Sequence, residues 1–170
     1  EAGAIGANVE DVVGDAPALL DYTLCVERIQ AGREAADAAG IPFVINARTD
    51  VYLIESGASP AMFDEAVRRC NAYRDAGARC TYVPGPADAD LIGRLAAAID
   101  GPLNILAGAD SPATAKMLEL GVARVSIGGS LARACLKLAA DAAAELRDSG
   151  TYEFSRNSFS NPQMNRKFEP

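Results

Sequence analysis

Short apolar runs alternate with helical patterns along most of the chain, and this alternation restricts the fold more than any other feature of the sequence. Polar, Gly or Pro residues end each apolar run, and apolar residues at helical spacing follow it. The expected strands are residues 2–9, 41–50, 80–83, 103–106 and 122–127, and the expected helices are residues 20–39, 59–77, 88–99, 111–120 and 131–146. Five strand–helix units with short connections are typical of an α/β protein with an all-parallel sheet, either barrel-like or doubly wound.

The expected site is built around the strand at residues 41–50. Its continuous apolar run at 43–45 is typical of a strand that is covered on both faces, and polar residues crowd its carboxyl end. Because ligands of α/β proteins bind at that end, Arg48 is a candidate for binding a carboxylate or phosphate group. The sequence leaves open the alternative that Arg48 forms a salt bridge with a neighbouring acid such as Asp50.

Other polar residues follow other expected strands. Glu10 and Asp11 end the first strand; Glu10 either serves the site, or caps a helix or pairs with an arginine, and Asp11 is expected to position the following loop. Asn104 and Asp110 flank the end of a later strand and could face a substrate. The turn at residues 128–130 (Gly-Gly-Ser) opens the last helix and could bind phosphate, although close packing of a turn also explains its glycines.

Net charge and hydropathy exclude several classes of partner. The formal net charge of −7 offers no basic stripe, so we expect no nucleic acid and no anionic membrane surface as partner. No apolar run reaches the length of a membrane span, and the first residues lack the pattern of a signal peptide. The expected compartment is therefore the cytoplasm.

The sequence contains no histidine, which excludes Ser-His-Asp and Cys-His nucleophilic sites and His-ligated metal centres from these residues. Four cysteines lie far apart with no Cys-x-x-Cys spacing, so neither zinc nor a disulfide framework is indicated. We expect reduced, buried side chains at all four: Cys25, Cys70, Cys80 and Cys135. Chemistry in this chain would use carboxylates, Arg, Lys, Tyr, Cys or a metal held by oxygen ligands.

Helix starts and the end of the regular pattern are marked in the sequence. Ser59-Pro60 and Ser111-Pro112 are expected helix starts, because Ser is a favoured N-cap and Pro fits the first helical turn. Gly150 ends the regular pattern, and residues 151–170 are an aromatic-containing arm. We expect two parts, residues 1–150 and residues 151–170, with the arm packing on a neighbouring subunit.

Five motifs occur in a fixed order along the chain. They are Gly-Ala-Asn-Val-Glu-Asp at 6–11, Arg-Ile-Gln-Ala-Gly-Arg at 28–33, Asn-Ala-Arg-Thr-Asp at 46–50, Val-Pro-Gly at 83–85 and Gly-Val-Ala-Arg-Val-Ser-Ile-Gly at 121–128. In this order they resemble the isocitrate lyase and phosphoenolpyruvate mutase superfamily. The resemblance implies a (β/α)8 TIM-type barrel, of which this chain supplies strands four to eight and the C-terminal arm. Such a barrel takes roughly 250 residues, so about 80 residues are expected before Glu1.

The resemblance also implies a chemistry. Members bind a 2-oxo acid or enolpyruvate across Mg²⁺, and the metal stabilises the enolate-like charge that develops when a C–C or P–C bond breaks. By resemblance Arg48 binds the substrate carboxylate, and Glu10 reaches Mg²⁺ through water. The direct metal ligands are expected on the third strand, before Glu1. Arg48 and Glu10 are thus the expected catalytic residues, with Asn104 and Gly85 as further substrate-binding candidates.

Departures from the superfamily pattern narrow the expected reaction. Residues 12–20 lack the Cys-containing gating loop of isocitrate lyases and the Lys-x-Asn of phosphonate mutases, and Cys25 is expected in the core instead. Gly85 stands near the place of a glutamate in the lyases. The chain therefore resembles the short-loop branch, which includes oxaloacetate decarboxylase-like enzymes.

This branch predicts Mg²⁺-dependent cleavage of a C–C bond in a small 2-oxo carboxylate, for example with release of pyruvate. The alternatives are P–C chemistry like that of phosphoenolpyruvate mutase or carboxyphosphonoenolpyruvate phosphonomutase, and a non-catalytic partial barrel. Members commonly swap a C-terminal helix between neighbouring subunits. A homo-oligomer, either a dimer or a tetramer, is therefore expected.

Overall fold

The computed structural model describes residues 3–12, 14, 18–54, 57 and 59–169. By the density of internal contacts the chain divides into two units, residues 1–127 and residues 128–170, which are considered in turn. None of the helices in the described residues is long and apolar enough to cross a membrane. Residues 13 and 15–17 of the short loop expected after Glu10 lie outside the described residues.

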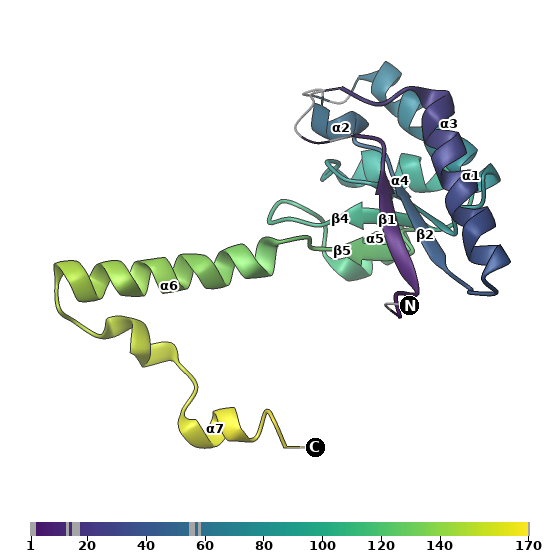
Figure 1. The fold of residues 1–170 in the computed structure, drawn as a ribbon. Helices are drawn as coiled ribbons and strands as arrows, with labels where there is room; N and C mark the ends of the chain where they lie inside the picture. The colour runs from purple at the N-terminus through teal and green to yellow at the C-terminus, as the bar shows by residue number, and fades with distance from the viewer. Residues whose placement is uncertain (1–2, 13, 15–17, 55–56, 58, 170) are drawn as a thin grey trace. The chain divides into compact units, whose positions relative to one another are not determined.

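The first unit is an α/β structure with one parallel sheet (Figure 1). Its strands, each paired with the next in sequence order, are β1 (Gly6–Glu10), β2 (Val44–Arg48), β3 (Cys80–Val83), β4 (Leu103–Leu106) and β5 (Arg124–Ser126). Its helices are α1 (Tyr22–Ala38), α2 (Val51–Ile54), α3 (Pro60–Asp75), α4 (Ala89–Ala98) and α5 (Thr114–Glu119). The predicted parallel sheet is confirmed, and the short helix α2 is an addition to the prediction.

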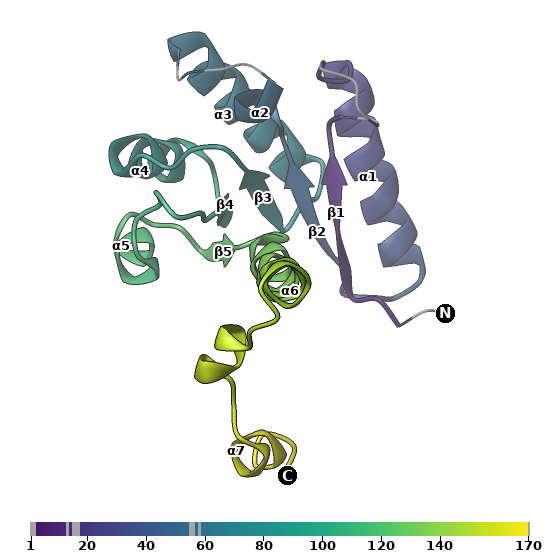
Figure 2. The ribbon, with the colours of Figure 1, turned by 90° about the vertical axis from the view of Figure 1, so that its left-hand side faces the viewer.

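Helices α1, α3, α4 and α5 cover one face of the sheet (Figure 2). Side chains alternate along each strand, so Ile45 and Ala47 of β2 pack under α1 and α3 in a buried apolar cluster. The alternate residues point to the opposite face, and there Val44 remains 37% exposed. The helices of this unit cover one face of β2, and cover of its second face stays a prediction.

The helix starts depend on which side chains reach the free N–H groups. The Ser59 side chain accepts a hydrogen bond from the Met62 N–H, which confirms the predicted start of α3. The predicted start of the next Ser-Pro helix is wrong, because α5 begins at Thr114 without a side-chain cap. Ser111 instead accepts a hydrogen bond from the Gly108 N–H within the preceding turn.

The second unit holds α6 (Ser130–Asp148), the 3-10 helix η1 (Glu153–Asn157) and α7 (Asn161–Asn165). Regular structure therefore continues past Gly150, contrary to the prediction. The Glu145 carboxylate holds the turn after α6 by accepting hydrogen bonds from the Thr151 hydroxyl and the Glu153 N–H. The predicted boundary near residue 150 and docking of the arm on a neighbouring subunit stay predictions.

The predicted burial of the cysteines is confirmed for three of the four. Cys25, Cys70 and Cys80 are free and buried, and Cys25 belongs to the core as predicted. Cys135 on α6 is exposed within the described residues, so its predicted burial is wrong.

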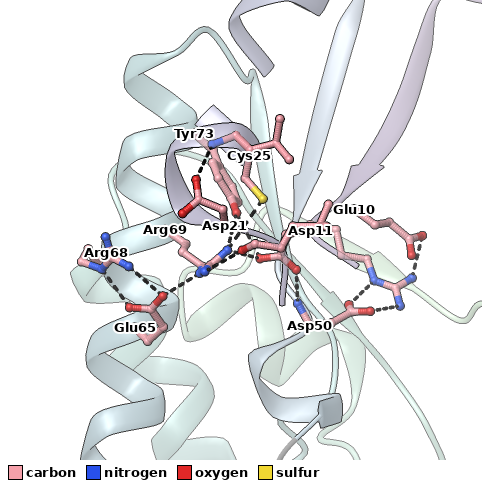
Figure 3. A network of polar contacts seen from close by, with 12 residues as sticks. Glu10, Asp11, Asp21, Cys25, Asp50, Glu65, Arg68, Arg69 and Tyr73 are labelled. Carbon is pink, nitrogen blue, oxygen red and sulfur yellow. Dashed lines mark hydrogen bonds and ion pairs between the residues drawn. The ribbon is translucent and has the colours of Figure 1, made fainter. Parts of the chain in front are cut away.

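A buried carboxylate joins the ends of β1 and β2 to helix α3 (Figure 3). Asp11, which directly follows β1, is 2% exposed. Its Oδ1 accepts from the backbone N–H of Asp50 at 2.9 Å, and its Oδ2 accepts from the Tyr73 hydroxyl at 3.0 Å and from Arg69 at 3.2 Å. Asp11 thus fixes the backbone that follows both strands, and its carbonyl accepts from the Leu20 N–H at 2.8 Å.

The partner of this carboxylate is an arginine inside the apolar face of α3. Arg69 also donates to Glu65 at 2.6 Å and to the Leu20 carbonyl at 3.2 Å. Burial acts to lower the pKa of Arg69, but its hydrogen bonds to Glu65 and Tyr73 and the charge of Asp11 outweigh burial and raise that pKa. Arg69 is therefore a permanently charged, fully engaged group that holds the loop after β1 against α3.

Asp11→Asn should lower the free energy of unfolding by about 3 kcal/mol, because it leaves the buried Arg69 without one of its charge partners. The measurement is urea denaturation followed by circular dichroism. The control is Asp37→Asn, which removes an ion pair between the exposed Asp37 and Arg33 on one helix face and should cost less than about 1 kcal/mol. Equal losses in the two variants would contradict the structural role of Asp11.

Gly85, just after β3, has a backbone conformation and a neighbour that exclude a side chain. Its φ is +111°, and a Cβ there would lie 2.7 Å from the Cβ of Tyr52 and 3.0 Å from its carbonyl oxygen. The glycine thereby lets β3 and helix α2 approach each other closely. This packing role neither requires nor excludes the predicted contact of Gly85 with substrate.

Gly85→Ala should therefore destabilise the protein by at least about 2 kcal/mol, through backbone strain and overlap with Tyr52. Gly108→Ala is the matched control, since φ is not positive there and no atom lies within 4 Å of the added Cβ. Denaturation midpoints that shift equally in both variants would refute the packing argument.

Candidate functional site

The structure places Glu10 and Arg48 side by side at the carboxyl ends of neighbouring strands. They are paired residues in the register of β1 and β2, so their side chains leave the sheet on the same face. Val9 and Ala47, the residues before them, pack toward the helices. Glu10 and Arg48 therefore point to the opposite face, which we call the polar face because it also carries Tyr82, Asn104 and Arg124 in register.

The guanidinium of Arg48 is held by two carboxylates (Figure 3 shows both acids). Asp50 binds it in a bidentate manner, to Nε at 2.5 Å and to Nη2 at 2.9 Å, and Glu10 accepts from Nη1 at 3.0 Å. Both alternatives left open by the sequence, an Arg48–Asp50 salt bridge and a Glu10–arginine pair, are thus present. These bonds use three of the five N–H groups of the arginine, and the described residues offer no partner to the other two.

The environment of Arg48 keeps it charged and partly accessible. Its side chain is 21% exposed, and that of Glu10 is 40% exposed. Burial acts to lower the pKa of Arg48, but the hydrogen bond and charge of Asp50, and the charge of Glu10, raise it overall. Because Asp50 is itself fixed through its backbone N–H to Asp11, the guanidinium is presented in a set orientation.

Tyr82 on β3 is a polar-face residue that the sequence interpretation missed. It is the register partner of Arg48, whose Cζ lies 5.5 Å from the centroid of the tyrosine ring. Tyr82 is only 4% exposed, and burial raises the pKa of its hydroxyl. Neighbouring residues of a strand point to opposite faces of the sheet, so Tyr82 lies on the face opposite to that of the apolar Val83. This alternation was the signal in the sequence that could have identified Tyr82 as a polar-face residue.

Asn104 on β4 lies next to Tyr82 in the register and is completely buried. Its Oδ1 accepts from the Ser126 hydroxyl at 3.0 Å. Its Nδ2 is buried without a hydrogen-bond partner among the described residues. Asn104 therefore belongs to the polar face with Arg48, whereas Asp110 is exposed in the loop after β4.

A Mg²⁺ ion needs several oxygen ligands, and this requirement can be compared with the residues present. Within the part of the chain that the structure describes, no group of three or more Asp, Glu, Cys or His side chains could hold a metal. Glu10 uses Oε1 for Arg48, and its half-exposed carboxylate leaves Oε2 for a water molecule. Glu10 fits the water-mediated role, but the described residues do not make a complete metal site.

The glycine-rich turn before α6 remains a separate candidate. Gly128 has a φ of +51°, and the Ser130 hydroxyl accepts a hydrogen bond from Arg133 within the same helix. These contacts are consistent with a tight helix start, and phosphate binding at residues 128–130 stays a prediction.

Comparison with known proteins identifies relatives over most of the chain. The sequence model of the phosphoenolpyruvate phosphomutase family matches residues 1–147. An uncharacterized protein of Mycobacterium tuberculosis is 34% identical over 143 residues, which make up 84% of this chain and 52% of that protein. The chain thus spans about half the length of the curated relatives it matches.

Solved structures show the same fold. A Burkholderia cenocepacia J2315 protein described as a "putative lyase/mutase" is 37% identical, with a TM-score of 0.86 over 99% of this chain and 60% of that one. 2,3-Dimethylmalate lyase is 22% identical, with a TM-score of 0.74 over 94% of this chain and 56% of that one. Phosphonopyruvate hydrolase, in complex with oxalate and Mg²⁺, is 24% identical, with a TM-score of 0.73 over 96% and 58%.

The last two similarities concern the fold alone, and the family match rests on the sequence. That match covers both strands that carry the pair Glu10 and Arg48, and the ordered motifs that predicted it from the sequence are present. The chain belongs to the phosphoenolpyruvate phosphomutase family.

Proposed function

We propose that the protein is a Mg²⁺-dependent lyase that cleaves a C–C bond of a small 2-oxo carboxylate through an enolate-like intermediate. The superfamily consists of lyases and mutases that act on C–C or P–C bonds. The observation that carries the proposal is the position of the Arg48 guanidinium. Hydrogen bonds to two acids, Asp50 and Glu10, hold it at the carboxyl end of β2.

Arg48 supplies the substrate-binding group. A guanidinium with two uncommitted N–H groups can bind a carboxylate, and its delocalised charge persists at any physiological pH. Asp50 holds one edge of the guanidinium in a bidentate manner, so the orientation of the remaining N–H groups is set before substrate arrives. Such preorganisation lowers the entropic cost of positioning the substrate.

The charges around Arg48 favour a bound cation. Glu10 and Asp50 carry formal charges of −1 each and Arg48 carries +1, so the three groups sum to −1. At this end of β1 and β2 the two carboxylates outnumber the guanidinium, which favours a bound cation beside an anionic substrate. Mg²⁺, when bound, would supply that positive charge and stabilise negative charge on the oxygen of the reacting 2-oxo group.

Glu10 is the residue of this chain that we assign to the metal, as the acceptor of a hydrogen bond from metal-bound water. The proposal requires direct ligands from residues outside those described. It therefore includes the interpretation that the five-stranded sheet is part of a (β/α)8 barrel whose other strands complete the site.

Phosphonomutase-type P–C chemistry is the second candidate function. It is favoured by the name of the matching family and by a second Burkholderia cenocepacia J2315 structure, described as a "putative phosphonomutase", which is 37% identical over 84% of this chain and 58% of that one. Its substrates would also carry a carboxylate for Arg48. The choice between the two reactions therefore depends on an assay.

The test is a substrate screen on the intact protein with and without Mg²⁺. We expect Mg²⁺-dependent turnover of a 2-oxo acid such as oxaloacetate, followed by coupled detection of pyruvate. Turnover of phosphonopyruvate but of no 2-oxo dicarboxylate would establish the second candidate. No turnover, together with no binding of oxalate as an enolate mimic, would favour the non-catalytic partial barrel.

Arg48→Lys should weaken the binding of oxalate at least about 100-fold in the presence of Mg²⁺, because lysine keeps the charge but loses the fork of donors. Isothermal titration calorimetry measures the affinity. The matched control is Arg79→Lys, which changes an exposed arginine just before β3, at the opposite end of the strands. An Arg48→Lys affinity equal to that of the control would remove Arg48 from the site.

A further inference from the structure

A tyrosine hydroxyl lies on the polar face beside Arg48 without an evident structural task. Tyr82 is the register partner of Arg48 on β3, and the next residue in the register is Asn104 on β4. The apolar neighbours Val83 and Ile105 pack toward the helices, which confirms that Tyr82 and Asn104 point to the polar face.

We infer that the Tyr82 hydroxyl donates a hydrogen bond to the carboxylate or enolate-like oxygen of the ligand that Arg48 binds. This inference rests on the function proposed above and adds a second substrate-binding residue to it. The ligand class is a small carboxylate with an adjacent oxo or enolate oxygen, which the C–C and P–C substrates share.

The position of the ring is explained without the hydroxyl. The guanidinium carbon of Arg48 lies 5.5 Å from the ring centroid, so the aromatic face stabilises the cation, and a phenylalanine ring would also do this. Among the described residues the hydroxyl has no hydrogen-bond partner. The residue as a whole is only 4% exposed, but its hydroxyl oxygen is not among the fully buried atoms, so it can accept a ligand that approaches from outside the chain.

The charges around this hydroxyl fit an anion held beside Arg48. The groups that act on it are Arg48, Asp50, Glu10 and Arg124. A tyrosine hydroxyl is protonated at neutral pH, and burial raises the pKa of Tyr82 further, so it is a neutral donor that adds a hydrogen bond without adding charge. That property suits a site in which Asp50 and Glu10 already exceed the charge of Arg48.

Asn104 provides an independent observation of the same kind. Its side chain is completely buried, and its Nδ2 lacks a partner among the described residues although Ser126 satisfies its Oδ1. Two neighbouring residues of the polar face thus present uncommitted neutral donors next to the arginine. Their alignment with Arg48 in the register indicates a ligand that lies across β2, β3 and β4.

The test is Tyr82→Phe, which removes the hydroxyl and retains the ring under Arg48. We expect the affinity for oxalate with Mg²⁺ to fall about 10- to 100-fold by calorimetry, as for the loss of a hydrogen bond to a charged group, with the thermal midpoint nearly unchanged. The control is Tyr52→Phe, which removes a tyrosine hydroxyl that is buried without a described partner and belongs to α2. Its affinity should equal that of the wild type.

A second measurement on the wild-type protein does not depend on the stability of a variant. With tyrosine labelled at 13Cζ, oxalate should shift the Tyr82 resonance and leave that of Tyr52 in place, the Tyr82→Phe spectrum supplying the assignment. Wild-type affinity in Tyr82→Phe, or an unshifted Tyr82 resonance at saturating oxalate, overturns the inference and leaves the proposed function intact. Failure of the wild type to bind oxalate overturns both.

Discussion

The buried ion pair between Asp11 and Arg69 is the interaction on which the arrangement of the site depends. Removing two charges from water is unfavourable unless every donor and acceptor finds a partner. Here the Asp11 carboxylate accepts three hydrogen bonds, and Arg69 donates to Asp11, Glu65, Tyr73 and the Leu20 carbonyl. The cost of burial is thereby offset, and three segments far apart in the sequence are held together.

This pair acts on the site through the backbone. Asp11 follows Glu10 directly, and its Oδ1 binds the N–H of Asp50, the acid that orients Arg48. The positions of both strand-end side chains are therefore linked to one buried carboxylate. A site that needs a guanidinium in a set direction gains from such a rigid support, since small displacements weaken substrate binding.

The two faces of the sheet carry different kinds of side chains. On one face, Ile45, Ala47, Val83 and Ile105 bury apolar surface against the helices and stabilise the fold. On the polar face, Glu10 and Arg48 carry charge, and Tyr82 and Asn104 carry neutral polar groups. Apolar packing residues and polar residues thus alternate along the same short strands.

Much of the fold was predictable because it follows from local periodicity. The five strands, their parallel order and the Ser59 helix start reflect apolar spacing and capping, which act within a few residues. The start of α5 and the helices after Gly150 were not predicted, because a Ser-Pro pair or a polar tail permits more than one local structure. The placement of Glu10 and Arg48 at neighbouring strand ends was also accessible, since parallel strands end at one edge of a sheet.

By itself the sequence determined the strand–helix alternation, the family, and the presence of Arg48 and Glu10 at strand ends. Only the tertiary structure decided that Arg48 is shared by Asp50 and Glu10, that Arg69 is the buried partner of Asp11, and that Tyr82 lies beside Arg48. The physical reason is the separation along the chain over which each interaction acts. Periodicity and capping act between near neighbours in the sequence. Ion pairs join residues up to 58 positions apart, and only the packed fold brings these within hydrogen-bond distance.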